Sequence, residues 1–160
     1  MLRTSLAILF VVLLVSCNEN LVFSEFKSME GNSWSKENTL EFTFSKLDSV
    51  TTHNIFITVR NDDTFPYSNL FLITELNFPS GKTVKDTLEY EMALPDGQWL
   101  GKGYGSIKES KLWYKENIVF SDTGVYTLLL SHAMRKNGSA NGVIDLKGIT
   151  DVGFEIEKSK

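Results

Sequence analysis

The sequence contains one cysteine, Cys17, and the residues before it indicate the chemistry of its thiol. Residues 6–15 form an apolar run after the basic residue Arg3, and Ser16 directly precedes the cysteine. A basic start, an apolar run of about ten residues and a small residue at the cut are typical of a secretory signal peptide. The ending Leu-Val-Ser-Cys matches the bacterial lipobox, so we expect cleavage before Cys17 and lipidation of its thiol. An ordinary signal peptide with an incidental cysteine is the alternative.

Other residues with catalytic potential are few and badly spaced. The two histidines, His53 and His132, are far apart in the chain, and no pair has the spacing of metal ligands. No Gly-x-Ser-x-Gly elbow is present, and the glycines of residues 101–105 lack the spacing and the following helix of a phosphate loop. We therefore predict no catalytic residue, no metal site and no cofactor other than the covalent lipid on Cys17.

Aromatic residues cluster around this glycine-rich segment. Trp99 and Tyr104 flank Gly101 and Gly103, and Trp113 follows shortly after. On the face of a sheet such side chains stack on sugar rings or anchor a protein partner. The alternative is that both tryptophans fill the core, because tryptophan is highly buried on average.

The mature chain has the size and charge of one ordinary domain. Removal of residues 1–16 leaves 144 residues and, because Arg3 is lost, changes the net charge from −4 to −5. This mildly acidic balance argues against a nucleic-acid partner, which would require a basic face. No later stretch is long and apolar enough to span a bilayer, so the lipid is the expected membrane anchor.

Alternation of apolar and polar residues, interrupted by turns, runs through the mature chain and predicts strands. The predicted strands cover residues 21–26, 40–45, 55–60, 68–78, 83–94, 112–120, 124–132 and 152–157. No segment sustains a helical period, so we predict an all-β fold, a single antiparallel β-sandwich of jelly-roll or immunoglobulin-like topology. The expected organisation is a signal peptide at 1–16, a lipidated tether with an edge strand at 17–35 and the sandwich at 36–160.

Several blocks of the sequence together resemble the gliding-motility lipoprotein GldH family of Bacteroidetes. Besides the lipobox at Cys17 they are residues 65–71 (FPYSNLF), 86–90 (DTLEY), 95–103 (PDGQWLGKG), 133–135 (AMR) and 148–153 (GITDVG). They occur in order over nearly all of the mature chain. One departure is His132, where a glutamine or a similar polar residue is expected.

The resemblance implies a role in the cell envelope rather than a reaction. It implies an accessory lipoprotein needed for gliding, with other gliding lipoproteins as partners and a link to type IX secretion. The expected docking surface is the loop around Trp99, Gly101, Gly103 and Tyr104, together with Tyr67 and Arg135. A carbohydrate-binding lipoprotein that uses its exposed aromatics is the alternative.

The expected location is the outer membrane, with the domain facing the periplasm. Only one acidic residue, Glu19, stands among the three residues after Cys17. A dense acidic tract at this point would have indicated export to the surface in this phylum.

Overall fold

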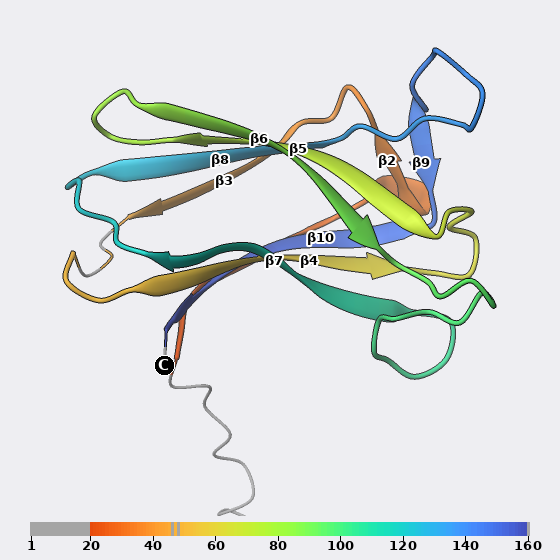
Figure 1. Ribbon diagram of the computed structural model, residues 1–160, viewed down its shortest axis with the longest axis horizontal. Helices are drawn as coiled ribbons and strands as arrows, with labels where there is room; N and C mark the ends of the chain where they lie inside the picture. Colours follow the sequence, from red (N-terminus) through yellow and green to blue (C-terminus); the bar gives the residue numbers. More distant parts are fainter. Residues whose placement is uncertain (1–19, 46, 48, 160) are drawn as a thin grey trace, which may run out of the picture.

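The protein is a sandwich of two four-stranded antiparallel sheets, as Figure 1 shows. The computed structural model describes residues 20–45, 47 and 49–159. Sheet 1 has the order β1-β10-β4-β7 and sheet 2 the order β3-β8-β5-β6, while β2 and β9 form a separate two-stranded ribbon. The strands are β1 (Leu21–Ser28), β2 (Ser33–Ser35), β3 (Leu40–Ser45), β4 (His53–Asn61), β5 (Asn69–Asn77), β6 (Thr83–Glu91), β7 (Lys108–Ile118), β8 (Val125–His132), β9 (Asp145–Lys147) and β10 (Ile149–Lys158). A single 3₁₀ turn, η1 (Glu30–Asn32), precedes β2 within the described residues, and no described helix is long and apolar enough to cross a membrane.

The predicted all-β sandwich is confirmed, and most predicted strands are present because alternation in sequence becomes alternation of burial. In β3 the residues Leu40, Phe42 and Phe44 are buried and their neighbours are exposed. The short strands β2 and β9 were not predicted, because three residues are too few to show a period. β10 begins at Ile149, three residues earlier than predicted, and β7 begins at Lys108.

The N-terminal segment belongs to the folded sandwich from Leu21 onward. β1 pairs with β10 from Leu21↔Glu157 to Ser28↔Asp151, so it is the edge strand of sheet 1. Trp34 on β2 is fully buried, and its indole N–H donates to the backbone O of Asn38 at 2.9 Å. The domain boundary predicted at residue 36 therefore lies inside the packed domain.

The core between the sheets centres on aromatic rings. Phe44 has ring contacts at 5.3–5.7 Å with residues of both sheets and of the β7–β8 connection. These partners are Phe23, Phe120, Tyr126 and Phe154. Stacked, tilted and edge-on ring pairs of this kind add to the stabilisation from buried area.

One side of the sandwich is closed by polar contacts between edge strands of the two sheets. The hydroxyl of Tyr90 on β6 donates to the backbone O of Trp113 on β7 at 2.6 Å, and that of Tyr114 donates to Asp86 at 3.0 Å. The Nζ of Lys115 lies 2.8 Å from the same Asp86 carboxylate, and this contact lowers the pKa of Asp86. These contacts bridge β6 and β7, which are not neighbours in either sheet.

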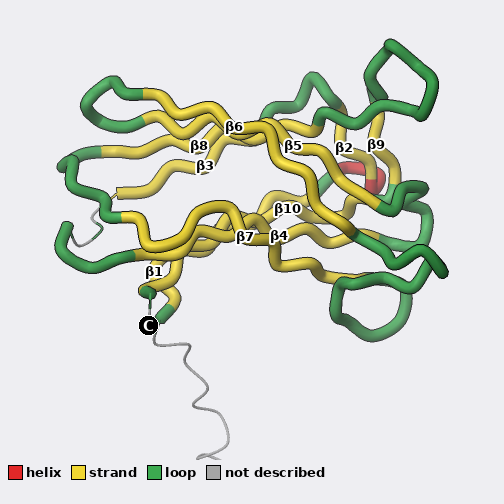
Figure 2. The backbone as a smooth tube through the Cα atoms, in the orientation of Figure 1, coloured by secondary structure: helices red, strands yellow, loops and turns green. Residues whose placement is uncertain are grey.

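The loops divide between two ends, and both described chain ends lie at the same one. The strands run so that the connections β3–β4, β5–β6 and β7–β8 share the end where the last described residues lie (Figure 2). We call it the anchored end, because the expected lipidation site, Cys17, comes three positions before the first described residue. The backbone N–H of Lys158 donates to the O of Asn20 at 2.8 Å, which places residue 20 there too. The connections β4–β5, β6–β7 and β8–β9 lie at the other, distal end.

Gly148 provides a test of close packing at the distal end. Its φ is +82°, and a Cβ at this position would overlap the backbone of Phe65. Gly81 has nearly the same φ, +85°, but no atom lies within 4 Å of the point that a Cβ would occupy. We expect Gly81→Ala to lower the free energy of unfolding by about 1–2 kcal/mol through the left-handed backbone alone. Gly148→Ala should cost a further ~1–3 kcal/mol from overpacking.

Chemical denaturation of both variants measures this difference. Equal losses of unfolding free energy would contradict the close contact between Gly148 and Phe65.

Tyr90 and Tyr114, which form hydrogen bonds between β6 and β7, should make the stability of the fold sensitive to high pH. Burial raises the pKa of Tyr90 from 10.0 to about 12 and also raises that of Tyr114. Below pH 10 both the folded and the unfolded chain keep Tyr90 neutral, so ionisation of Tyr90 does not change the free energy of unfolding there. Between pH 10 and 12 the unfolded chain ionises first, so the free energy of unfolding should fall as pH rises through this range.

Tyr90→Phe should reduce this loss at high pH, at a cost of about 1 kcal/mol at neutral pH for the hydrogen bond to Trp113. Thermal melts from pH 8 to 12 measure both effects, and Tyr104→Phe, at a fully exposed position, is the control. An unchanged slope in Tyr90→Phe would show that other groups cause the alkaline loss.

Candidate functional site

The two histidines lie in separate buried positions at opposite ends of the sandwich. His53 begins β4 at the anchored end, with its ring 5.7 Å from that of Phe120. His132 ends β8 at the distal end and packs edge-on against Trp34 at 5.4 Å, and burial lowers its pKa. Among the described residues no group of three or more His, Cys, Asp or Glu side chains could hold a metal ion. Cys17 lies outside the described residues.

Phe65 brings together two of the residues predicted for docking. Its buried ring lies 5.8 Å from the ring of Tyr67 and 6.1 Å from that of Trp99. Tyr67 comes from the β4–β5 connection and Trp99 from the β6–β7 connection, so Phe65 joins two loops that are distant in sequence. Both outer rings are partly exposed.

Trp99 is held by its backbone in a small hairpin. The hairpin turns at Gly97, whose φ is +86°, and it is closed by hydrogen bonds from Leu94 N–H to Gln98 O and from Leu100 N–H to Met92 O, at 2.8 and 2.9 Å. The indole packs against the core cluster rather than standing free in solvent. Trp99 therefore stabilises the distal loops and offers only part of its ring to a partner.

Gly101 and Gly103 shape the loop by letting its backbone pass close to β7 and the residues before it. A Cβ on Gly101 would come 2.8 Å from Ser110 Oγ, and a Cβ on Gly103 would come 2.5 Å from the backbone O of Ile107. The close approach lets Lys102 and Glu109 exchange backbone hydrogen bonds of 2.8 and 2.7 Å.

Tyr104 occupies the tip of this loop. Its side chain is fully exposed. Lys108 holds the loop in place, because its Nζ donates to the backbone O of Gly103 at 3.1 Å and of Gly105 at 2.8 Å. The tip therefore presents an aromatic ring on a loop that is tied to its own base.

Arg135 lies on the third distal loop and is exposed, with a backbone bridge to Gly142. Beside this loop is a shallow depression of about 540 Å³ that Tyr67 lines together with Lys136 and Lys147. Arg135 itself is not among the residues that line this depression. The predicted residues thus share one end of the molecule, but they do not form one compact site.

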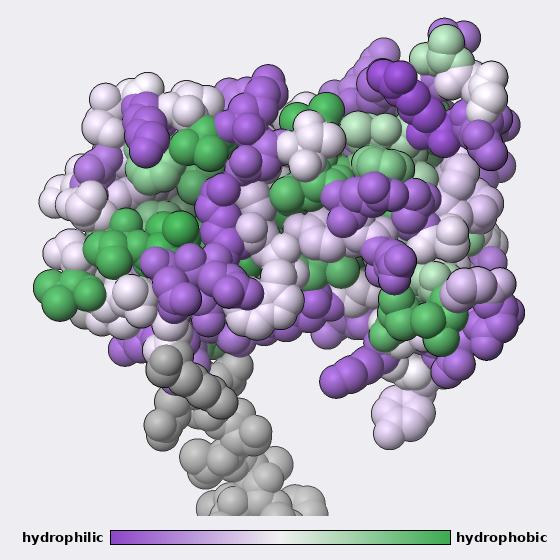
Figure 3. Space-filling model, viewed as in Figure 1, coloured by the Kyte–Doolittle hydropathy of each residue, from purple (hydrophilic) through white to green (hydrophobic). Residues whose placement is uncertain are grey.

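Aliphatic residues of the same loops are exposed as well, and they were not predicted. Leu94, Leu100 and Ile107 on the β6–β7 connection are exposed by 38–47%, and Ile144 before β9 is exposed by 66%. Figure 3 shows hydrophobic surface over this end of the molecule as well as over the anchored end. We call Leu94, Leu100, Tyr104, Ile107 and Ile144 the distal surface. The signal that could have revealed them was apolar residues inside glycine-rich, turn-forming segments.

The aromatic residues proposed for sugar stacking lie in three different settings. Trp99 packs on Phe65 at the distal end, while Tyr104 stands alone at a loop tip. Trp113 lies on the outer face of β7, 51% exposed, with its ring 4.4 Å from that of Phe56. It borders a depression of about 430 Å³ lined with amide and carboxylate side chains. The three rings therefore do not form a row on one face.

Comparison with known proteins gives a consistent result over nearly the whole chain. The model of the family described as GldH lipoprotein matches residues 21–156. A relative in Christiangramia forsetii, named gliding motility lipoprotein GldH homolog, is 49% identical over 149 residues, 93% of this chain and 91% of the relative. The gliding motility lipoprotein GldH of Flavobacterium johnsoniae is 44% identical over 156 residues, 98% of this chain and 96% of the relative.

Among solved structures, the VP2 subviral particle of infectious bursal disease virus matches 88% of this chain and 34% of its own chain, with a TM-score of 0.33 and 14% identity. A likeness at this level carries no argument. The family match and the two relatives, by contrast, cover nearly the entire described sandwich, and by them the chain belongs to the GldH lipoprotein family.

Proposed function

We propose that this chain is a lipid-anchored accessory protein of gliding motility that docks other gliding lipoproteins through its distal surface. The observation that carries the proposal is the separation of the two ends. Residue 20, three positions after Cys17, lies at the anchored end, whereas exposed apolar side chains gather on loops at the opposite end. Exposed apolar clusters rimmed by polar residues are typical of protein interfaces.

The geometry of the distal surface favours recognition over catalysis. Tyr104 is a fully exposed ring on a restrained loop, and aromatic residues of this kind are frequent hot spots of binding energy. We propose that the protein scaffolds or stabilises its partners and, through them, the linked type IX secretion machinery, with no catalysis of its own. Its proposed location is the outer membrane, facing the periplasm.

Glycan binding is the second candidate function, and Trp113 is the observation that favours it. A half-exposed indole beside Asn54, Asn117 and Glu157 offers both a stacking face and hydrogen-bonding groups. A single ring gives less stacking area than a row, so we place this candidate after protein docking.

The lipid anchor is tested by mass. The protein isolated from the cell envelope should begin at Cys17 and carry acyl chains, and Cys17→Ala should remain unacylated and uncleaved at this position. Mass spectrometry of the N-terminal peptide measures both outcomes. Asn18→Ala, which keeps the thiol, is the control. A mature N-terminus elsewhere, or a free thiol at Cys17, would contradict the anchor.

The docking role is tested at the distal surface. Tyr104→Ser, and the pair Leu100→Ser with Ile107→Ser, replace exposed side chains and should leave the melting temperature unchanged. If Tyr104 is a hot spot, its loss should weaken binding by about 2 kcal/mol, roughly 30-fold. We expect reduced spreading of colonies and reduced recovery of the gliding lipoproteins, identified by mass spectrometry after crosslinking in intact envelopes.

The matched control is the pair Glu41→Ser with Thr43→Ser, two exposed positions on β3. Normal spreading and normal recovery in the distal variants would refute docking through this surface. Measurable affinity for envelope glycans that disappears in Trp113→Ser, with no lipoprotein recovered, would favour the second candidate.

A further inference from the structure

The anchored end carries its own set of exposed apolar residues. Val50 in the β3–β4 connection is 85% exposed, Val119 after β7 is 44% exposed and Val125 at the start of β8 is 59% exposed. They lie on connections that share one end of the sandwich, and Figure 3 shows hydrophobic surface there. Three exposed apolar side chains at one end of the molecule are candidates for contact with an apolar surface.

Hydrogen bonds tie two of these connections to the ends of the chain. The backbone N–H of Ser159 donates to the O of Thr52 at 2.9 Å, two residues after Val50. The hydroxyl of Ser159 and the backbone N–H of Asn117 both donate to Asn54 Oδ1 at 3.0 Å. Because Lys158 is bonded to Asn20, the valine-bearing loops and the start of the described chain form one connected unit.

The length of chain before residue 20 limits how far this unit can stand from a bilayer. Three residue steps separate Cys17 from Asn20, and a fully extended chain spans at most about 3.6 Å per residue, or about 11 Å in total. With the acyl chains of Cys17 in the membrane, Asn20 lies within this distance of its surface. A small folded domain is roughly 30 Å across, so no such domain fits between this end and the lipid.

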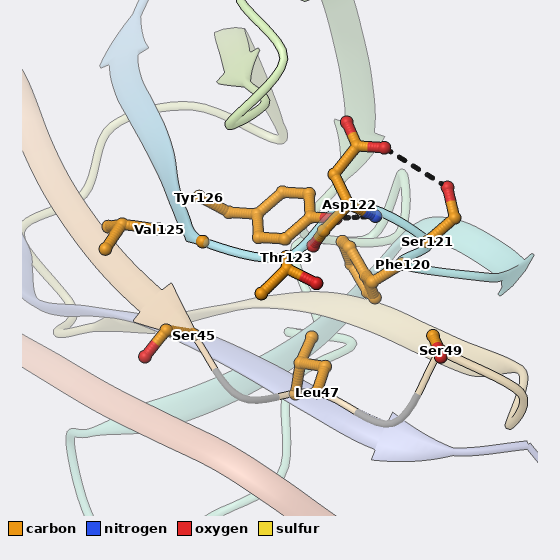
Figure 4. Close-up of a pocket in the computed structure, with 10 residues that line it drawn as sticks. Ser45, Leu47, Ser49, Phe120, Ser121, Asp122, Thr123, Val125 and Tyr126 are labelled. Carbon is orange, nitrogen blue, oxygen red and sulfur yellow. Dashed lines mark hydrogen bonds between the residues drawn. The ribbon is translucent and has the colours of Figure 1, made fainter.

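The surface next to Val125 is shallow, and its described residues are mostly uncharged. A depression of about 370 Å³ is lined by Leu47, Phe120 and Val125 together with serine and threonine side chains (Figure 4). The one acidic group among its described lining residues, Asp122, accepts hydrogen bonds from the hydroxyls of Ser80 and Ser121, at 2.5 and 3.3 Å. Hydroxyls and small apolar side chains suit the headgroup region of a phospholipid layer.

We propose that Val50, Val119 and Val125 seat the sandwich directly on the phospholipid surface, entering the headgroup region beside the acyl anchor. This inference rests on the lipid anchor of the proposed function and adds an orientation to it. The anchored end lies flat on the bilayer, and the distal surface points away from it. Apolar side chains at such an interface are buried about 5–10 Å deep.

The test uses the full-length lipidated protein in vesicles of phosphatidylethanolamine and phosphatidylglycerol. Because the thiol of Cys17 is blocked by lipid, a single new cysteine can carry an environment-sensitive dye. Val50→Cys and Val125→Cys report on the anchored end, and Ile107→Cys, exposed on the distal surface, is the matched control. Vesicle flotation, dye emission and quenching by spin-labelled lipid are measured for each variant.

We expect all three variants to float with the vesicles. The dyes at positions 50 and 125 should shift to the blue and be quenched by spin-labelled lipid several-fold more than the dye at 107. Flotation with equal, water-like emission at all three positions would overturn the inference while leaving the anchor intact. Failure to float would instead overturn the anchor.

A second measurement distinguishes contact of the anchored end with lipid from contact with a covering protein. In intact envelopes, accessibility of the cysteines at positions 50 and 125 to a polar maleimide should match that in pure vesicles. Protection of positions 50 and 125 in envelopes, but not in vesicles, would mean that a protein covers this end and would overturn seating on lipid.

Discussion

Antiparallel pairing of β1 with β10 is the constraint on which the rest of the architecture depends. It begins at Leu21↔Glu157, so it brings the first and last described residues to one end of the sandwich. Any anchor attached at Cys17 is then tied closely to that end. Because neighbouring strands alternate in direction, three connections lie at the anchored end and the other long connections lie at the distal end.

The distal end is rigid enough to present side chains in a fixed arrangement. Phe65 packs under Tyr67 and Trp99, and the absence of a side chain at Gly148 lets the β9–β10 turn approach the backbone of Phe65. The loop with Tyr104 is tied by Lys108 to its own base. Pre-ordered loops lose little conformational entropy when a partner binds, which favours a docking role over a role as a flexible linker.

The fold was predictable where alternation persists over five or more residues, as in β3 and β5. Burial of Trp34 was not predictable, because three-residue strands have no readable period. Burial of the other tryptophans depends on tertiary contacts: Trp99 follows a turn that folds back on Phe65, while Trp113 faces outward because Leu112 faces the core. The place of Tyr104 in a glycine-rich loop was predictable from its segment, but the exposure of the aliphatic residues on the same connection was not.

The length of the strands sets how far the proposed docking surface lies from the anchored end. β4 contains nine residues, His53–Asn61, and spans about 30 Å at 3.3 Å per residue. If the anchored end rests on lipid, the distal surface stands about this far from the bilayer. A partner anchored in the same membrane then has to extend to that height, and confinement of both proteins to one surface raises their effective concentration. Modest affinity at the distal surface is sufficient under this confinement, which is consistent with an interface formed by a few exposed side chains on the β6–β7 and β8–β9 connections.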